Sequence, residues 1–154
     1  MNVRKYEKKD IPALMRIWNE VVEAGQAYPQ EEFLTEQTAE EFFAVQSFTA
    51  AAEDNGEANN VGRCGHIANA SYAVRSDMRG KHVGCELVYD CLHRCKELGF
   101  RVLQFNAVVA DNIPALALYK SLGFAQLGVI PGGFRKKDGT YADIIPHYFD
   151  VTKL

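Results

Sequence analysis

Apolar residues recur every three or four positions along three stretches of the chain, and this spacing places them on one face of an α-helix. The pattern predicts helices over residues 11–24, 83–98 and 112–122. Each stretch is followed by a glycine that is a natural helix end: Gly25, Gly99 and Gly123. A shorter fourth helix is predicted after the capping box formed by Thr38 and Glu41.

Shorter runs rich in apolar residues separate these helices and predict strands. They lie at residues 3–6, 47–53, 66–74, 102–109, 124–130 and 141–149. The 102–109 run is largely apolar, which is typical of a central strand that is buried on both faces. Because helices interleave with strands, the sequence predicts an α/β or α+β fold with helices on the faces of a sheet.

One region breaks this pattern. Asn55-Gly56 is a strong signal for a two-residue hairpin turn after the 47–53 strand. The return strand should follow, but residues 57–63 contain almost no residues that favour strands. The sequence therefore predicts that this return strand is shortened or missing.

Length, composition and charge limit the class of protein. The chain has 154 residues, 47% of them apolar and 24% charged, which fits one domain spanning residues 1–154. The net charge of −3 argues against a dedicated nucleic-acid-binding protein. No signal peptide is expected, and no apolar run approaches the ~18 residues that span a membrane, so no membrane partner is expected either.

The cysteines and histidines do not form a recognisable chemical motif. No two cysteines have CxxC spacing, and we expect reduced thiols in a cytoplasmic protein. The four histidines have neither HExxH nor clustered Cys/His spacing, so no metal is expected. The cysteines are Cys64, Cys85, Cys91 and Cys95.

The segment with the clearest chemical signal joins the 66–74 strand to the 83–98 helix and reads Arg79-Gly80-Lys81-His82-Val83-Gly84. A helix start stabilises an anion through its unpaired N–H groups and its dipole, and glycines let those groups converge on a phosphate. The segment matches neither the Walker A pattern nor the dinucleotide fingerprint GxGxxG. From this pattern alone, a phosphate-binding loop and an ordinary turn with solvated basic residues both remain open.

A second motif follows at a characteristic distance and reads Asn112-x-x-Ala115-x-x-Leu118-Tyr119-x-x-x-Gly123-Phe124. The two motifs together resemble the GNAT family of N-acetyltransferases, whose acyl-CoA loop has the pattern Arg/Gln-x-x-Gly-x-Gly/Ala. Arg79 and Gly84 match that pattern, whereas His82 stands where the family usually has glycine. The segment Ile17-Trp18-Asn19-Glu20 is similar to the family's small-molecule amine acetyltransferases.

The resemblance implies a mixed, strongly twisted sheet with helices on both faces, which splays between its fourth and fifth strands to admit acyl-CoA. These strands would be residues 66–74 and 102–109. The return strand discussed above would be the third strand, and its weak sequence leaves open a CoA-binding module that no longer catalyses.

The resemblance also assigns site residues. Acetyl-CoA would be held by the loop from Arg79 through Gly80, Lys81, His82 and Val83 to Gly84, by the backbone at Val74, and by Asn112 and Ala115. Asn112 can also act as a helix cap. Tyr119 would be the general acid that protonates the leaving thiolate, with aromatic packing as the alternative. His66 and Glu20 are the two candidates for the general base.

The predicted function is transfer of an acetyl group from acetyl-CoA to a primary amine of a small molecule or amino-acid-like acceptor. The transfer would be direct, in a ternary complex, so the cysteines are not needed as nucleophiles. Acetylation of a peptide or protein N-terminus is the alternative acceptor class. A homodimer is also expected, because the sheet edge near residues 59–65 looks incompletely covered.

Overall fold

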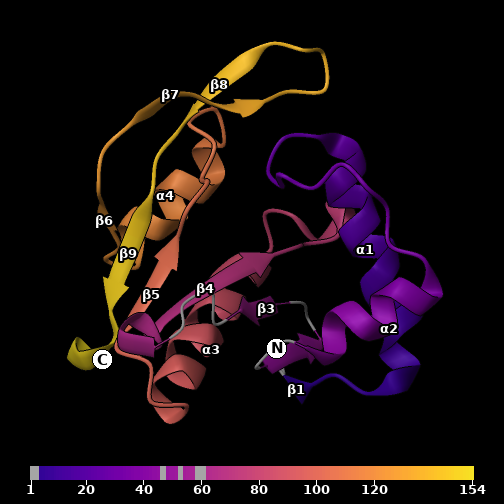
Figure 1. Cartoon of the computed structure of the whole chain (residues 1–154), viewed down its shortest axis with the longest axis horizontal. Helices are drawn as coiled ribbons and strands as arrows, with labels where there is room; N and C mark the ends of the chain where they lie inside the picture. The colour runs from indigo at the N-terminus through magenta and orange to yellow at the C-terminus, as the bar shows by residue number, and fades with distance from the viewer. Residues whose placement is uncertain (1–3, 46–47, 52–53, 58–61) are drawn as a thin grey trace.

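The structure, a computed structural model, describes residues 4–45, 48–51, 54–57 and 62–154. Within these residues a mixed sheet has the strand order β1-β2-β3-β4-β5-β9-β6, and β7 and β8 form a separate hairpin (Figure 1). The strands are β1 Arg4–Lys5, β2 Phe48–Ala51, β3 Asp54–Glu57, β4 Ile67–Tyr72, β5 Val102–Phe105, β6 Ala125–Gln126, β7 Ile130–Arg135, β8 Tyr141–Ile144 and β9 His147–Asp150.

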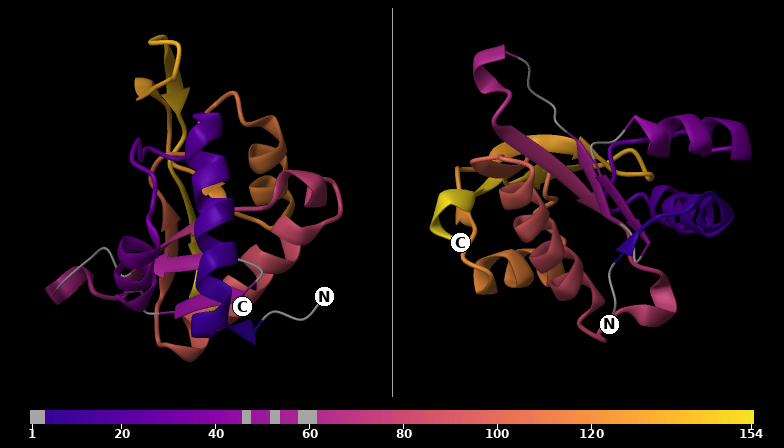
Figure 2. Two further views of the ribbon diagram at one scale, coloured as in Figure 1. Left: turned by 90° about the vertical axis from the view of Figure 1, so that its right-hand side faces the viewer. Right: turned by 90° about the horizontal axis from the view of Figure 1, so that it is seen from below.

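Helices cover both sides of the sheet. Helices α3 and α4 lie on one side, and α1 and α2 lie on the other, as Figure 2 shows. Their bounds are α1 Ile11–Ala24, α2 Glu36–Ala44, α3 Val83–Glu97 and α4 Ile113–Ser121. The largest buried cluster lies between α3 and strands β4 and β5, where Leu103 is fully buried. Burial of this apolar surface is the main stabilising contribution to the fold.

The third strand, which the sequence predicts to be shortened or missing, is present and short. β3 has four residues and pairs on both sides, with β2 through Phe48↔Gly56 and with β4 through Gly56↔Ala70. Asn55 and Gly56 therefore lie inside a strand, and residues 52–53, which join β2 to β3, lie outside the described residues. Two complete backbone ladders outweigh the low strand propensity of these residues, because that propensity depends strongly on context.

Several other boundaries differ from the sequence prediction. β5 ends at Phe105 rather than at residue 109, and of the predicted 124–130 strand only β6 and the first residue of β7 are strand. Helix α2 begins three residues earlier than the predicted capping box, because Thr35 is the N-cap and its Oγ1 accepts from the Thr38 N–H at 3.2 Å. The predicted final strand is two strands, β8 and β9, which are separated by Ile145-Pro146. Proline lacks the N–H that a continuous ladder needs at that point.

Strands β4 and β5 separate part of the way along their length, which confirms the predicted splay. They pair in parallel only from Ile67↔Val102 to Asn69↔Gln104. Beyond that point β4 stays paired with β3 as far as Tyr72, whereas β5 pairs with β9 through Phe105↔His147. In Figure 1 the two strands diverge, and an opening forms between their C-terminal ends.

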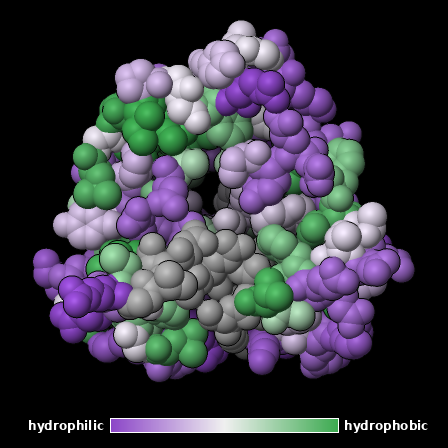
Figure 3. Space-filling view, in the orientation of Figure 1, coloured by the Kyte–Doolittle hydropathy of each residue, from purple (hydrophilic) through white to green (hydrophobic). Residues whose placement is uncertain are grey.

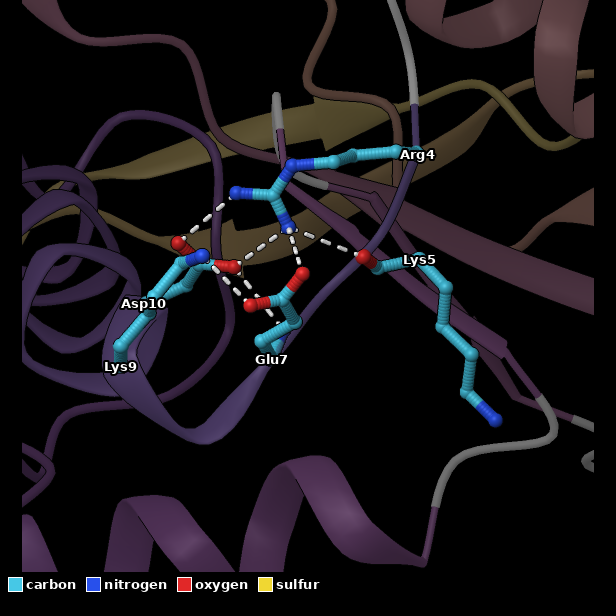
Figure 4. A network of polar contacts seen from close by, with 5 residues as sticks. All are labelled: Arg4, Lys5, Glu7, Lys9 and Asp10. Carbon is cyan, nitrogen blue, oxygen red and sulfur yellow. Dashed lines mark hydrogen bonds and ion pairs between the residues drawn. The ribbon is translucent and has the colours of Figure 1, made fainter.

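A network of charged side chains joins β1 to the start of α1 (Figure 4). The Asp10 carboxylate accepts from both terminal nitrogens of Arg4, at 2.7 and 3.0 Å, and from the Glu7 N–H at 2.8 Å. These contacts, led by the Arg4 hydrogen bond, lower the pKa of Asp10 from its ordinary 3.8 to about 2. The network fixes the angle at which the chain leaves the sheet edge and enters α1.

This pKa shift predicts how stability depends on pH. Because the unfolded Asp10 carboxyl takes up a proton at higher pH than the folded one, its contribution is complete above about pH 4 and is lost as the pH falls towards 2. We expect Asp10→Asn to be less stable than the wild type at pH 7, and the difference to shrink between pH 4 and 2. Urea unfolding at several pH values measures this, and a difference that does not change with pH would contradict it.

Candidate active site

A cavity of about 1100 Å³ fills the opening between β4 and β5. Its walls come from the ends of both strands, the first turn of α3, one side of α4, the C-terminal part of α1 and the β7–β8 hairpin. In Figure 3 the molecular surface is hollowed in the middle of this face. A cavity of this size has room for a cofactor-sized ligand.

The Arg79–Gly84 loop forms one edge of the cavity. All its residues line the cavity except Lys81, whose Nζ lies 3.7 Å from Met78 Sδ instead. Cys85 and Glu86 donate their N–H groups to the His82 carbonyl, so α3 begins at this loop. The N–H groups of Val83 and Gly84 belong to the first turn, where N–H groups lack intrahelical acceptors and suit a phosphate.

His82 has a left-handed backbone conformation with φ +60°, and no other non-glycine residue in the described ranges has a positive φ. This position corresponds to the glycine of the family pattern, which is the residue that takes this conformation without strain. A side chain with a Cβ pays about 1–2 kcal/mol there. The loop has therefore kept the glycine backbone geometry with a histidine in place.

The strain at residue 82 can be measured by comparing two variants. We expect His82→Gly to be more stable than His82→Ala by about 1 kcal/mol, because only glycine removes the left-handed penalty while both lose the imidazole. Chemical denaturation measures the difference. We also expect His82→Gly to bind acetyl-CoA at least as tightly as the wild type in calorimetry. Equal stability of the two variants would show that the loop is not strained.

Helix α4 brings Asn112, Ala115 and Tyr119 to the other wall of the cavity. Asn112 caps the helix, because its Oδ1 accepts from the Ala115 N–H at 3.3 Å. The Tyr119 ring packs against Phe105, with ring centroids 4.7 Å apart, and against Phe124 at 5.5 Å. Tyr119 thus lines the cavity and is also an aromatic packing residue, and its role as the general acid stays a prediction.

His147 does not line the cavity, but its ring contacts that of Tyr119, and the sequence did not single it out. It is only 1% exposed, its Nδ1 donates to the Ile145 carbonyl at 2.6 Å, and its ring lies 5.6 Å from that of Tyr119. Because a carbonyl can only accept, the Nδ1 carries the proton in this contact. His147 reaches Tyr119 through the pairing of β9 with β5, and no local spacing in the sequence signals that pairing.

The two candidate bases do not lie in the cavity. His66 precedes β4 rather than lying on it, and its carbonyl accepts from the Arg101 N–H at 2.9 Å, at the end of the strand opposite the opening. The Glu20 carboxylate accepts from the Ser76 N–H at 3.1 Å and so ties α1 to the segment after β4. The structure brings neither residue together with Tyr119. His66 lies just before the start of a strand, and Glu20 makes a hydrogen bond that links two segments of the fold.

The β7–β8 hairpin reaches across to α1 and the segment that follows it. Arg135 forms an ion pair with Glu31, and Lys137 Nζ donates to the Glu23 carbonyl at 3.1 Å. At Gly25, which ends α1 with φ +62°, a Cβ would come within 3.1 Å of Lys137 Cβ. The hairpin therefore bridges the cavity at the end of α1.

Other chemistry is not signalled by the described residues. No group of three or more His, Cys, Asp and Glu within them is placed to hold a metal ion. Their helices include none that is long and apolar enough to cross a membrane. None of the four cysteines forms a disulfide, and Cys85 is the one that lines the cavity.

Proteins that are similar to this chain in sequence and in structure include N-acetyltransferases. Residues 12–124 match the acetyltransferase (GNAT) family. The N-acetyltransferase aca1 of Schizosaccharomyces pombe is 30% identical over 88% of this chain and 77% of its own. A GCN5-related N-acetyltransferase from Kribbella flavida is 31% identical and superposes with a TM-score of 0.86 over 97% of this chain and 96% of that chain. The chain therefore belongs to the acetyltransferase (GNAT) family, and it is a transferase.

A more distant solved structure has the same fold. It is a phosphinothricin acetyltransferase from Sinorhizobium meliloti in complex with acetyl-CoA, 20% identical, with a TM-score of 0.83 over 97% of this chain and 87% of that chain. Together these matches confirm the family resemblance and the fold that it implied. The roles of individual site residues stay predictions.

Proposed function

We propose that this protein transfers an acetyl group from acetyl-CoA to a primary amine of a small molecule or amino-acid-like acceptor. The observation that carries the proposal is the cavity between the diverging strands, which has the Arg79–Gly84 loop on one wall and Tyr119 on the other. Family membership supports the acetyl transfer. The bound acetyl-CoA of the Sinorhizobium meliloti protein supports the choice of cosubstrate.

The residues of the cavity suggest how the transfer proceeds. The N–H groups of the first turn of α3 would bind the pyrophosphate, and Arg79 would add positive charge. The backbone after β4, at Val74, would donate to the carbonyl oxygen as negative charge develops on it. The amine forms the new C–N bond as the C–S bond breaks, and the Tyr119 hydroxyl protonates the departing thiolate. The nitrogen releases its extra proton to solvent, and solvent returns a proton to Tyr119.

No general base is assigned, because His66 and Glu20 lie outside the cavity. Asp111 carries the single carboxylate among the described residues that line it, and this carboxylate pairs with Lys136. The acceptor would therefore react as the neutral amine fraction already present in solution. The rate would then rise with pH until the acceptor amine is fully deprotonated.

The bridge between the β7–β8 hairpin and α1 favours a small acceptor over a peptide. Arg135 contacts Glu31 and Lys137 contacts the Glu23 carbonyl, so the hairpin and α1 border the cavity on that side. A peptide needs room for the chain beyond its first residue, whereas a small amine does not. Acetylation of a peptide or protein N-terminus is thus the second choice.

A non-catalytic CoA-binding module is the other alternative, and its main support has weakened. That reading rested on a third strand shortened or missing between residues 56 and 66, whereas β3 is paired on both sides and residues 58–61 lie outside the described residues. Tyr119 also lines the cavity. What still favours this module is His82 in the position of the family glycine.

One assay separates these functions. We expect release of free CoA from acetyl-CoA, detected with a thiol reagent, when the protein is given a panel of amines, amino acids and short peptides. Turnover with peptides alone would favour the N-terminal acetyltransferase. Acetyl-CoA binding without turnover on any acceptor would favour the non-catalytic module, and absence of binding at millimolar acetyl-CoA would refute the proposed function.

A homodimer and a cytoplasmic location also stay proposals. The edge that suggested a dimer, residues 59–65, lies partly outside the described residues, and β3, which precedes it, pairs with both its neighbours. The edge strand β6 is a better place for a second copy, since Leu127, Val129 and Ile130 follow it and are 59%, 57% and 49% exposed. Light scattering after size-exclusion chromatography would test the dimer, and a monomer at high concentration would contradict it.

A further inference from the structure

Lys136 and Asp111 form an ion pair on the wall of the cavity. Asp111 lies just before α4 and Lys136 lies just after β7, so the fold brings them together across 25 positions of sequence. Both line the cavity, and no other lysine or carboxylate does so among the described residues. The Lys136 side chain is 36% exposed and the Asp111 side chain is 64% exposed.

Lys136 lines the cavity because side chains alternate between the two sides of the extended chain that contains it. Successive side chains of an extended chain point to opposite sides. Phe134 and Lys136 line the cavity, whereas Arg135 and Lys137 make the contacts with Glu31 and Glu23. Lys136 therefore lines the cavity, and it takes no part in the contacts of Arg135 and Lys137 with α1 and the segment after it.

Another carboxylate can replace Asp111 as the partner of Lys136 with little loss of folding stability. A pair between partly exposed charges contributes about 0–1 kcal/mol to stability, so replacing one carboxylate by another leaves the fold intact. The hydrogen bond from Lys136 to Asp111 raises the pKa of Lys136, which keeps the side chain cationic at neutral pH. Asp111 thus places a carboxylate on Lys136 at a point that a ligand in the cavity can also reach.

We propose that Lys136 binds the carboxylate of the acceptor and that the acceptors are therefore amino acids. The acceptor carboxylate replaces the Asp111 carboxylate as the ion-pair partner of Lys136. This inference rests on the proposed function and narrows its acceptor from small amines in general. The aromatic side chains Trp18 and Phe134 line the same cavity and would contact an apolar part of the acceptor. A charge-assisted hydrogen bond of this kind is specific, because an uncharged amide cannot replace the carboxylate.

The first experiment uses the wild-type protein and three forms of each acceptor. CoA release is measured with the common L-amino acids, with their amides and with the corresponding decarboxylated amines. We expect at least one amino acid to have a kcat/KM about tenfold or more above its amide and its amine, a ratio that corresponds to about 1.4 kcal/mol. If no amino acid exceeds its amide, the inference is overturned, while turnover of the amides would leave the proposed function standing.

The second experiment tests Lys136 itself with the preferred amino acid. We expect Lys136→Met to raise KM about tenfold or more with little change in kcat, and to leave the kinetics of the matching amine unchanged. Lys136→Arg should recover most of the affinity, because it restores the positive charge. Lys153→Met is the matched control, since Lys153 also pairs with an aspartate, Asp150, but does not line the cavity.

Two results would overturn the role of Lys136. One is an equal loss for the amino acid and the amine in Lys136→Met, which would indicate a structural effect on the cavity. The other is an unchanged KM for the amino acid, which would place its carboxylate elsewhere. Absence of CoA release from every compound, together with absence of acetyl-CoA binding, would refute the proposed function as well.

Discussion

Tyr119→Phe is expected to lower kcat by about a hundredfold or more, because a positioned general acid contributes typically 10²–10⁴-fold. The leaving thiolate would then have to depart without a proton from the protein. Phenylalanine keeps the ring that packs against Phe105 and Phe124, so the fold and the affinity for acetyl-CoA should stay within about twofold. Steady-state kinetics measures kcat, and calorimetry measures the affinity.

A second tyrosine provides the control for this change. Tyr141 lies on β8, is 67% exposed and does not line the cavity, so Tyr141→Phe should leave kcat unchanged. A loss of acetyl-CoA affinity in Tyr119→Phe that accounts for the whole loss of activity would show that the hydroxyl binds the cosubstrate. Full activity in Tyr119→Phe would remove the acid role altogether.

The sequence predicted the parts of the fold that are encoded locally. The bounds of α1 and α3 follow from apolar spacing and from Gly25 and Gly99, and the structure places both glycines directly after or close to the helix ends. The turn before α3 could also be predicted, because glycines at a strand-to-helix junction carry their own conformational meaning. Such signals lie within a few residues of the feature they describe.

The sequence failed where partners distant along the chain decide the structure. β3 is a strand because β2 and β4 flank it, although Asn55 and Gly56 alone favour a turn. Local propensity competes there with two backbone ladders, and the ladders prevail. The same limit applies to His66, because the sequence predicts it to lie on a strand, whereas the strand begins one residue later.

The candidate site was predicted only in the part that carries motifs. The Arg79–Gly84 loop and the Asn112–Tyr119 segment each form a continuous stretch, and both line the cavity apart from Lys81 and the outward-facing residues of α4. Lys136 and Asp111 reach the cavity from the β7–β8 hairpin and from the segment between β5 and α4, and His147 reaches the Tyr119 ring from β9. No spacing in the sequence links these positions, so only the three-dimensional structure reveals them.

Phe105 connects the core to the site, and Phe105→Ala is expected to lower the free energy of unfolding by about 3–5 kcal/mol. The residue is 4% exposed and lies where β5 turns away from β4. Its ring centroid lies 5.6 Å from that of Tyr72, 4.7 Å from that of Tyr119 and 4.9 Å from that of Phe124. Truncation therefore removes contacts from three rings at once and leaves a cavity behind.

The same change should reduce activity at temperatures where the protein is still folded, because the Tyr119 ring loses its nearest aromatic neighbour. Chemical denaturation measures the loss of stability, and kinetics well below the melting temperature measures the loss of kcat. Phe105→Leu, which keeps most of the volume, should cost much less, and Phe33→Ala should cost little because Phe33 is 57% exposed. A loss below about 1 kcal/mol in Phe105→Ala would show that the core can close around the missing ring. Tyr119 would then be held mainly by Phe124 and His147. The divergence of β4 and β5 would also not depend on the contact between the Tyr72 and Phe105 rings.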